Sequence, residues 1–393
     1  MIGSCRYNEK YLLHILRLKQ RDSKANLARE TGLTAAAVGS LIKSLQDKGL
    51  VENVGKVQGD MGQPATLFSL SKNGAYGLGV SLNRGHIETV MINFVGEIVA
   101  SKKHDLILPS PEEAQAIIIE DIRVLLDAAP AEVGPRIAGI GVAQPGQMGS
   151  WSQGDRDWSD WDEFDLAAQL SQAFRFPAYS QNDVSAAAIA ELIYGGSPAT
   201  NDFLYVFFGG SQVQSFGGGL ILNGECRDGG AGNAGDVGLI PVGPSTLYGD
   251  SAAASEDDKG LNADFLTHRC ALSSLVTYLK SEGFSIENAE DFHRVIALEP
   301  ERVGRWLSDC VMAFERAIFA IQAVVDVPEL IIDCEDADAY LIERVIEGLK
   351  ARLASNLYTG IHFPQIRKGG FGSDASAIGA ATLPLDSSFS LKK

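Results

Sequence analysis

The sequence predicts an α/β protein in which a small N-terminal helical module with a β-hairpin precedes a larger α/β body. Helical apolar periodicity runs through residues 8–47 before a Gly-rich hairpin, and triplets of strands crossed by a helix occur twice after Tyr76. Residues 1–72 contain 11 Lys and Arg against 6 Asp and Glu, whereas the remainder contains 22 against 44. This division favours nucleic-acid binding by the module alone, although a balance of +5 is also compatible with ordinary surface variation.

Length and cysteine content place the chain among proteins of the reducing cytoplasm. A chain of 393 residues is long enough for two or three domains. Its five cysteines are scattered and contain no CxxC pair, so no disulfide framework is indicated. The sequence lacks the apolar core of a signal peptide and any uninterrupted apolar run of about 18 residues. We therefore expect a cytoplasmic protein without a membrane partner.

The module reads as a helix-turn-helix. An apolar stripe predicts a helix over Asn8–Gln20, and a short helix around Leu27 leads to a tight turn at Thr31–Gly32. Thr34 is a predicted N-cap for a second helix that extends to Asp47, and Gly49 is its predicted C-cap. The predicted buried face of this second helix comprises Val38, Leu41, Ile42 and Leu45. Two helices across a short Gly-containing turn form the helix-turn-helix unit.

Two short strands, Leu50–Glu52 and Thr66–Leu70, flank a Gly-rich stretch and predict a hairpin wing. The order of elements is typical of a winged helix-turn-helix, and the alternative is a helical protein–protein module. If the module binds DNA, the second helix lies in the major groove. The predicted DNA-binding residues are Lys24, Thr34, Ala35, Ala36, Ala37, Ser40, Lys43, Lys48, Lys56 and Gln63. Because alanine offers no hydrogen bond to a base, we expect much of the specificity to come from DNA shape or from the wing at residues 62–64.

The body begins with three predicted strands and a crossing helix. The strands are Gly77–Leu82, His86–Asn93 and Glu97–His104, and the helix is about Pro111–Ala129. One further strand in IAGIGVAQPG ends at a loop that contains Pro and Gly. Another, in PAYSQND, ends at an Asn-Asp pair, and a helix rich in small residues follows this pair. The segments NDFLYVFFGG and FGGGLILNGE predict two more strands. Two long helices are predicted over Arg302–Val325 and Ala339–Leu357.

The motifs GIGVAQPG, QNDVSAAAIAE, GGGLILNG, GNAGDVG and SDASAIGAA follow the wing in an order that resembles the ROK family of repressors, uncharacterised reading frames and sugar kinases. The resemblance implies a winged helix-turn-helix over residues 1–72 and a two-lobed actin-like (ribonuclease H-like, sugar-kinase) domain. Lobe 1 would comprise residues 73–195 with a returning segment at about 372–393, and lobe 2 residues 196–371. It also implies a homodimer or homotetramer, similar to the repressors of xylose or N-acetylglucosamine genes.

The phosphate-binding turns of the family's kinases are altered. The stretch Ser81–Gly85 stands where the kinases have Asp-x-Gly-Gly-Thr, and it lacks the acid. Val213–Ser215 occupy the start of a second Gly-rich turn, where the side chain of Val213 would block close backbone approach. Asp333–Asp336 replace a nucleotide-side Gly-Gly pair, and acids there repel phosphate. Phosphoryl transfer needs such a cradle, so we expect no ATP cofactor, no catalytic residues and no enzyme.

The sugar-binding residues of the family are better kept. Asn182 and Asp183 match a pair in which Asn binds a sugar hydroxyl and Asp is the kinase base, and amide and carboxylate groups suit hydroxyl recognition. The full set implied by the resemblance is Gln144, Pro145, Gly146, Asn182, Asp183, Gly232, Asn233 and Asp236. In each segment a plainer interpretation stays open: Asp183 is a helix N-cap, Pro145–Gly146 is a plain turn, and Asp236 is a turn residue.

The zinc motif of the family is absent from the sequence. Leu239 stands where the resemblance implies a histidine that touches both sugar and zinc, and GDSAAASEDDKGLNADFLTHRC replaces the zinc cysteines. Only His268 and Cys270 lie nearby, whereas tetrahedral structural zinc needs four ligands. We therefore expect no metal, and we expect this loop to be held by other contacts.

These observations together predict a DNA-binding transcriptional repressor whose degenerate ROK domain senses a sugar or related small molecule. Operator DNA would bind residues 1–72, and the carbohydrate effector would bind between the lobes. Two alternatives stay open: a ROK sugar kinase with a DNA-binding arm, and a regulator with a non-functional pocket that a protein partner controls.

Overall fold

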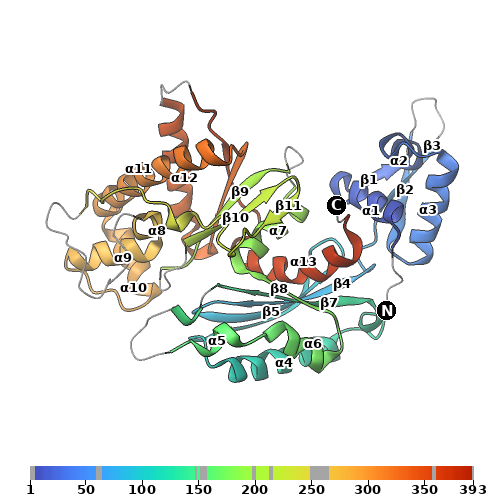
Figure 1. Ribbon diagram of the computed structural model, residues 1–393, viewed down its shortest axis with the longest axis horizontal. Coiled ribbons are helices and arrows are strands. Elements are labelled where there is room, and N and C mark those ends of the chain that lie inside the picture. Colours follow the sequence, from blue (N-terminus) through green and yellow to red (C-terminus); the bar gives the residue numbers. More distant parts are fainter. Residues whose placement is uncertain are drawn as a thin grey trace. The chain divides into compact units, whose positions relative to one another are not determined.

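The computed structural model describes residues 5–58, 64–146, 148–150, 157–196, 201–211, 216–247, 265–355 and 360–391. The chain folds into two compact units (Figure 1). Unit 1 comprises Met1–Pro198 and Ser376–Lys393, and unit 2 comprises Ala199–Ala375. The C-terminal segment therefore returns to the unit in which the chain begins.

Unit 1 starts with three helices and a small antiparallel sheet. The helices are α1 (Tyr7–Lys19), α2 (Lys24–Thr31) and α3 (Ala35–Asp47), and the strands are β1 (Arg21–Ser23), β2 (Val51–Gln58) and β3 (Pro64–Leu70). The sheet order is β1-β3-β2. Helices and hairpin lie where the sequence predicts them. Strand β1 was not predicted, because its three residues show no apolar pattern and only pairing with β3 defines it.

The caps of α3 explain its bounds. The Thr34 hydroxyl accepts a hydrogen bond from the Ala37 amide at 3.2 Å, which confirms the predicted N-cap. At the other end the C-cap is Lys48 rather than the predicted Gly49. Gly49 is the next residue and adopts φ +71°, the left-handed conformation that commonly ends a helix. Val38, Ile42 and Leu45 are buried as expected, whereas Leu41 is only half-buried.

The main sheet of unit 1 has five strands in the order β6-β5-β4-β7-β8. Its strands are β4 (Tyr76–Leu82), β5 (His86–Asn93), β6 (Ile98–Asp105), β7 (Ile137–Gln144) and β8 (Ala178–Asn182). Strands β4, β5 and β6 form an antiparallel meander, whereas β7 and β8 run parallel to β4. The carboxyl ends of β4, β7 and β8 therefore lie at one edge of the sheet.

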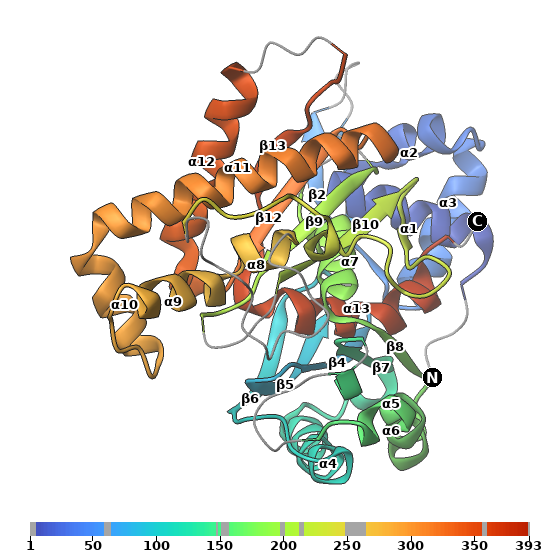
Figure 2. The same cartoon turned by 60° about the vertical axis from the view of Figure 1, so that its left-hand side comes forward.

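Helices cover both faces of this sheet, as Figures 1 and 2 show. On one face, α4 (Pro111–Ala128) and α6 (Leu166–Phe174) bury Ile118, Ile122 and Leu170 against the strands, beside the short α5 (Asp160–Glu163). On the other face lie α7 (Asp183–Tyr194) and α13 (Ala375–Phe389). Short 3-10 turns of unit 1 are η1 (Gly134–Arg136) and η2 (Met148–Ser150), whereas η6 (Gly372–Asp374) lies at the end of unit 2, just before α13.

Unit 2 is built on a five-stranded sheet with the order β11-β10-β9-β12-β13. The strands are β9 (Phe203–Phe208), β10 (Phe216–Leu222), β11 (Glu225–Arg227), β12 (Glu329–Cys334) and β13 (Gln365–Lys368). The helices are α8 (Leu266–Cys270), α9 (Leu272–Ser281), α10 (Ala289–Leu298), α11 (Pro300–Val324) and α12 (Ala339–Ser355), with 3-10 turns η3 (Val237–Leu239) and η5 (Asp336–Asp338).

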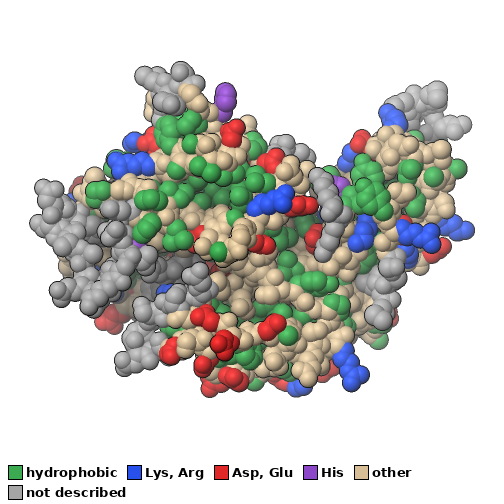
Figure 3. Space-filling view, in the orientation of Figure 1, with side chains coloured by type: hydrophobic (Ala, Val, Ile, Leu, Met, Phe, Trp, Pro, Cys, Tyr) green, Lys and Arg blue, Asp and Glu red, His purple; other side chains and the backbone are tan. Residues whose placement is uncertain are grey.

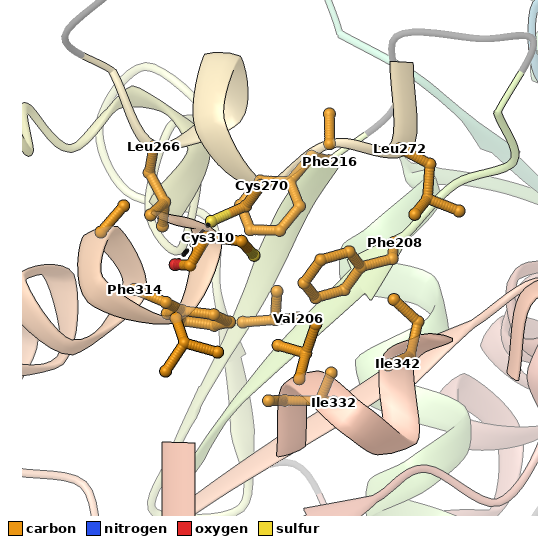
Figure 4. Close-up of a cluster of buried hydrophobic side chains, with 14 of the residues drawn as sticks. Val206, Phe208, Phe216, Leu266, Cys270, Leu272, Cys310, Phe314, Ile332 and Ile342 are labelled. Atoms are coloured by element: carbon orange, nitrogen blue, oxygen red, sulfur yellow. Dashed lines mark hydrogen bonds between the residues drawn. The ribbon is translucent and has the colours of Figure 1, made fainter. Parts of the chain in front are cut away.

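One large apolar core holds unit 2 together (Figure 4). Phe208 and Phe216 from neighbouring strands meet edge to face, with ring centroids 4.7 Å apart. Phe314 of α11 and Ile342 of α12 pack on the same cluster. Helices α11 and α12 start and end within two residues of their predicted bounds. Within the described residues, no helix is both long and apolar enough to cross a bilayer.

Candidate functional site

The carboxyl edge of the unit 1 sheet brings several of the predicted sugar-binding residues together. Gln144 ends β7 and Asn182 ends β8, and the two residues are paired partners in the parallel register. Ser81 is paired with Ala143 at the same edge, and its hydroxyl lies 2.9 Å from that of Ser376. In open α/β sheets, ligands bind beyond the carboxyl ends of the strands. The topology thus places an amide from each of two strands where a ligand can reach them.

Asn182, not Asp183, is the N-cap of α7. The Asn182 side-chain oxygen accepts hydrogen bonds from the amides of Val184 and Ser185, each at 3.1 Å. The alternative that assigned this role to Asp183 is therefore wrong by one residue. Asp183 is the first helical residue, where the helix dipole favours its negative charge. The Asn182 amide nitrogen donates to no described residue, so it is free to donate to a ligand.

The loop after β7 leaves space beside its backbone. Pro145 is half-buried and Gly146 is exposed. A β-carbon added at Gly146 would meet no described atom within 4 Å. Gly146 is therefore not required by packing among the described residues.

The turn that stands in place of the first phosphate turn is closed by its own side chain. The Asn83 side-chain oxygen accepts hydrogen bonds from the amides of Gly85 and His86, each at 2.8 Å. Its amide nitrogen lies 2.9 Å from His86 Nδ1. Backbone amides that could face a phosphate oxygen are thus already bonded to Asn83.

In unit 2 a buried carboxylate likewise accepts hydrogen bonds from backbone amides. Asp333, at the end of β12, is 1 % exposed, and its Oδ2 accepts hydrogen bonds from the Tyr205 hydroxyl at 3.0 Å and the Gly372 amide at 3.1 Å. Its Oδ1 accepts from the Cys334 amide at 3.0 Å. The residues Val213–Ser215 of the other predicted phosphate turn lie outside the described residues.

The segment that holds Gly232, Asn233 and Asp236 is a chain of tight turns on unit 2. Gly232 and Gly235 adopt φ +79° and +90°, which only glycine adopts readily. The Asp236 amide donates to the Asn233 carbonyl oxygen at 3.2 Å. Gly232, Asn233 and Asp236 are all exposed. The side chains of Asn233 and Asp236 are therefore accessible to a ligand.

Asp236 has a perturbed acidity despite its exposure. The atoms packed around the carboxyl raise its pKa above the ordinary value, and the Gly238 backbone amide partly offsets this. Leu239, at the position of the family histidine, is exposed as well.

A buried ion pair anchors the chain beyond this segment. Arg269 and Asp309 are 2 % and 1 % exposed, and the Arg269 guanidinium donates to Asp309 Oδ2 from Nε at 2.9 Å and to Oδ1 at 2.7 Å. Arg269 also donates to the Gly243 carbonyl oxygen at 3.0 Å, and Asp309 accepts from the Thr246 amide and hydroxyl, each at 2.9 Å. This network ties residues 243–246 to α8 and α11.

The environment of Asp309 keeps it ionised. Burial acts to raise the pKa of its carboxyl, but the bonds from Arg269 and Thr246 outweigh burial and leave the pKa below its ordinary value. The sequence predicted that other contacts would hold this loop, yet it gave no sign that Arg269 was buried. Residues 248–264, where the zinc cysteines were expected to be replaced, lie outside the described residues.

His268 and Cys270 are not arranged as a pair of metal ligands. The His268 ring contacts Phe265 with centroids 6.2 Å apart, whereas Cys270 is buried and its thiol lies 3.5 Å from the Cys310 carbonyl oxygen. Burial raises the pKa of the Cys270 thiol well above its ordinary value. No cluster of three or more His, Cys, Asp or Glu suited to a metal ion occurs within the described ranges.

The N-terminal module presents its predicted contact residues unevenly. Thr34, Ala35, Ala36, Ser40 and Lys43 are exposed on or beside α3, and Ala37 is half-buried. Lys24 and Lys56 are exposed too, and the ammonium group of Lys24 packs against Gly39 of α3. Lys and Arg side chains are visible on the face of this module that Figure 3 shows. Gln63 lies outside the described residues.

Lys48, which the sequence predicts as a phosphate contact, forms an ion pair with a buried acid of the module. Its ammonium group lies 2.8 Å from both carboxylate oxygens of Glu9, which is 3 % exposed. Burial acts to raise the pKa of Glu9, but hydrogen bonds from Lys48, the Arg6 amide and Ser44 outweigh it and lower the pKa. Lys48 therefore compensates a buried charge inside the module.

Comparison with known proteins assigns the class of this fold. Residues 77–387 match the model of the ROK family, and the chain belongs to that family. The xylose repressor of Bacillus subtilis is 21% identical over 394 residues, which cover 96% of this chain and 95% of the repressor.

Solved structures of the family share the fold. The crystal structure of a ROK family transcriptional regulator, a homolog of the Escherichia coli MLC protein, matches with a TM-score of 0.67 at 18% identity and covers 96% of each chain. The ROK hexokinase from Thermus thermophilus matches with a TM-score of 0.58 at 20% identity, over 78% of this chain and 96% of that enzyme. Unit 1 and unit 2 thus carry the actin-like fold of ROK proteins, which both regulators and kinases use.

The substitution Arg269→Met is expected to destabilise the protein by about 3–5 kcal/mol, because it leaves the Asp309 carboxylate buried without its partner. Urea unfolding of the full-length protein measures this loss of stability. The matched control Arg227→Met removes an ion pair with Glu225 in which both side chains are exposed, and it should cost less than about 1 kcal/mol. The double variant Arg269→Met/Asp309→Leu should recover much of the loss. A single variant as stable as the control would contradict the anchoring role.

Stability is also expected to fall as the pH is lowered from about 6.5 toward 4, because His86 resists protonation in the fold. Burial lowers the pKa of His86 to about 4, with Lys103 acting in the same direction and Asp105 against it. The unfolded chain takes up this proton near pH 6.5, so the stabilisation is complete above that pH and is lost below it.

Urea unfolding at about pH 7 and pH 5 tests this. His86→Gln should lower the change in stability between these two pH values by about 2 kcal/mol relative to the wild type. A pH dependence in His86→Gln equal to that of the wild type would show that burial does not lower the pKa of His86 in the folded protein.

Proposed function

We propose that this protein is a DNA-binding transcriptional repressor whose ROK domain senses a small carbohydrate. The observation that carries the proposal is that one chain combines a basic N-terminal module with a ROK domain. A basic module exposes one face of α3. The ROK domain that follows keeps hydroxyl-binding groups, and in its described residues Asn83 and Asp333 accept hydrogen bonds from turn amides. The similarity to a xylose repressor along nearly the whole chain supports the same function.

The module supports DNA binding as a winged helix-turn-helix. Helices α2 and α3 meet across Gly32, which adopts φ +68°, and the β2–β3 hairpin follows as the wing. In this proposal α3 enters the major groove, and Lys24 and Lys56 contact phosphates. The remaining proposed contacts are Thr34, Ala35, Ala36, Ala37, Ser40, Lys43 and Gln63.

The sugar-side residues support effector binding. Gln144 and Asn182 end paired strands, and the free Asn182 amide nitrogen can donate to a sugar hydroxyl. On unit 2, the exposed Asn233 and Asp236 offer an amide and a carboxylate. The proposed effector residues are Gln144, Pro145, Gly146, Asn182, Asp183, Gly232, Asn233 and Asp236.

Kinase activity is disfavoured by the same geometry. Phosphoryl transfer depends on backbone amides and cations that cradle the phosphates. Here the Asn83 side chain accepts a hydrogen bond from a turn amide in unit 1, and the Asp333 side chain accepts one in unit 2. Asp333 also adds a negative charge. We therefore propose a protein without catalytic residues that acts in the cytoplasm as a homodimer or homotetramer.

Lys43→Gln should weaken binding to a DNA fragment from upstream of the protein's own gene, because one phosphate or base contact on α3 is lost. Fluorescence anisotropy across a salt series should show a slope of log affinity against log salt that is smaller by about 1. Lys350→Gln on the exposed surface of unit 2 serves as the matched control and should bind as the wild type. Failure of the wild type to bind this DNA at low salt would overturn the proposed function.

Asp236→Ala should abolish the rise in melting temperature that the effector sugar produces, while DNA binding without the sugar stays unchanged. A thermal-shift screen with monosaccharides and their phosphates finds the sugar first, since a ligand of the folded state raises the melting temperature. Asp228→Ala removes another exposed acid from the same loop and is the control. If Asp236→Ala responds like the wild type, Asp236 is only a turn residue.

A further inference from the structure

A cavity of about 600 Å³ lies in unit 1, away from the residues proposed to bind sugar. It is found at the amino ends of β4 and β7, where Tyr76 begins β4 and Arg136 directly precedes β7, whereas Gln144 and Asn182 lie at the carboxyl ends. Cavities of this volume are typical of small-molecule sites. Most of its wall is apolar and comes from four elements: β5 with Met91, β6 with Ala100, α4 with Leu125, and the connection after α4 with Val133.

Arg136 is the one cation among the described residues that line this cavity. One of its guanidinium nitrogens donates to the Gly74 carbonyl oxygen at 2.9 Å and to the Lys48 carbonyl oxygen at 3.4 Å. Both acceptors are neutral, and no described carboxylate forms an ion pair with Arg136. A guanidinium presents five N–H donors, so donors remain for a second, anionic partner. An apolar wall with one uncompensated cation suits an apolar molecule that carries a single carboxylate.

Other ligand charges fit the cavity less well. Glu132 also lines it, but this acid is exposed, so water competes for any ammonium group that it would bind. A phosphate dianion needs more donors than Arg136 alone supplies. Tyr76 already donates its hydroxyl hydrogen to Asn73 Oδ1 at 2.9 Å. The carboxylate therefore has Arg136 as its main partner.

The same arginine joins the N-terminal module to the ROK part of unit 1. Lys48 is the C-cap of α3, and the guanidinium packs on the neighbouring Gly49, where a β-carbon would lie 2.7 Å from it. Gly74 belongs to the connection that leads into β4. Arg136 thus bridges the end of α3 and the start of the main sheet. A ligand that bonds to Arg136 acts directly on the contact that positions α3.

We propose that this cavity is a second effector site, which binds an apolar monocarboxylate through Arg136 and thereby changes the docking of α3 on unit 1. The ligand's apolar body packs on Met91, Leu125 and Val133. The site is separate from the proposed sugar site and does not depend on it.

Methyl NMR of protein labelled with [ε-13C]methionine tests binding without DNA. Met91 lines the cavity, whereas Met148 and Met312 are internal controls, and Met91→Leu assigns the signal. The probe 3-phenylpropionate should shift the Met91 signal saturably in the millimolar range, and phenethylamine, which carries the opposite charge on the same apolar body, should not. An unmoved Met91 signal, or an equal response to the amine, overturns the site.

Two variants test separately the charge of Arg136 and the volume of the cavity. Arg136→Gln should weaken 3-phenylpropionate at least about 10-fold, as expected when a desolvated ion pair is lost. Lys102→Gln removes an exposed cation from β6 outside the cavity and should bind as the wild type. Ala100→Phe fills the cavity, keeps Arg136, and should abolish binding while the Met148 and Met312 signals stay in place. Wild-type affinity in Arg136→Gln would overturn the assignment.

The effect on α3 is read by DNA affinity. Saturating 3-phenylpropionate should change the affinity for the upstream DNA about 5-fold or more in the wild type and leave Ala100→Phe unchanged. Binding at Met91 with no change in DNA affinity would overturn the link to α3. If the protein bound no DNA at all, the repressor proposal would fail, while the NMR result would still decide the cavity.

Discussion

The close approach of α13 to the unit 1 sheet is the packing constraint on which the rest of that unit depends. Strand residues Gly79 and Gly141 face backbone carbonyls of α13, where any β-carbon would collide. The helix can therefore lie on the strands, which brings Ser376 to Ser81 at the carboxyl edge. At its other end Phe389 meets Phe94 edge to face, with centroids 5.0 Å apart. Phe94 also lies under the Arg17 guanidinium of α1, and Lys10 of α1 donates to the Ser387 carbonyl oxygen of α13 at 3.4 Å. One helix therefore contacts both the carboxyl edge of the sheet and the N-terminal module.

A second feature of the structure is that two side chains accept hydrogen bonds from backbone amides of turns. Asn83 supplies a neutral oxygen to the amides of one turn, and Asp333 supplies a charged oxygen to those of another. A phosphate would have to displace these oxygens, and near Asp333 it would also meet a buried negative charge. In this chain, therefore, side chains of the protein itself are hydrogen-bonded to these turn amides.

Local signals in the sequence predicted much of this structure. Thr34 could be identified as a cap because its bond is made to Ala37, three residues away. Interactions between distant residues were missed. Lys48 pairs with Glu9 across 39 residues, and Arg269 pairs with Asp309 across 40, so neither partner is marked by its own neighbours. The N-cap of α7 was predicted at Asp183 but lies at Asn182, for another reason. Both residue types are good caps, and only the position at which β8 ends decides between them.

The Arg269–Asp309 pair has a consequence for how unit 2 is assembled. A structural zinc site acquires its stability only when the metal arrives and displaces protons from its ligands. Residues 243–246 are instead held by side chains that the chain itself encodes. Their placement is therefore completed in the same step as burial of α8 and α11. The order in which residues 243–246 reach their final position therefore follows the folding of α8 and α11.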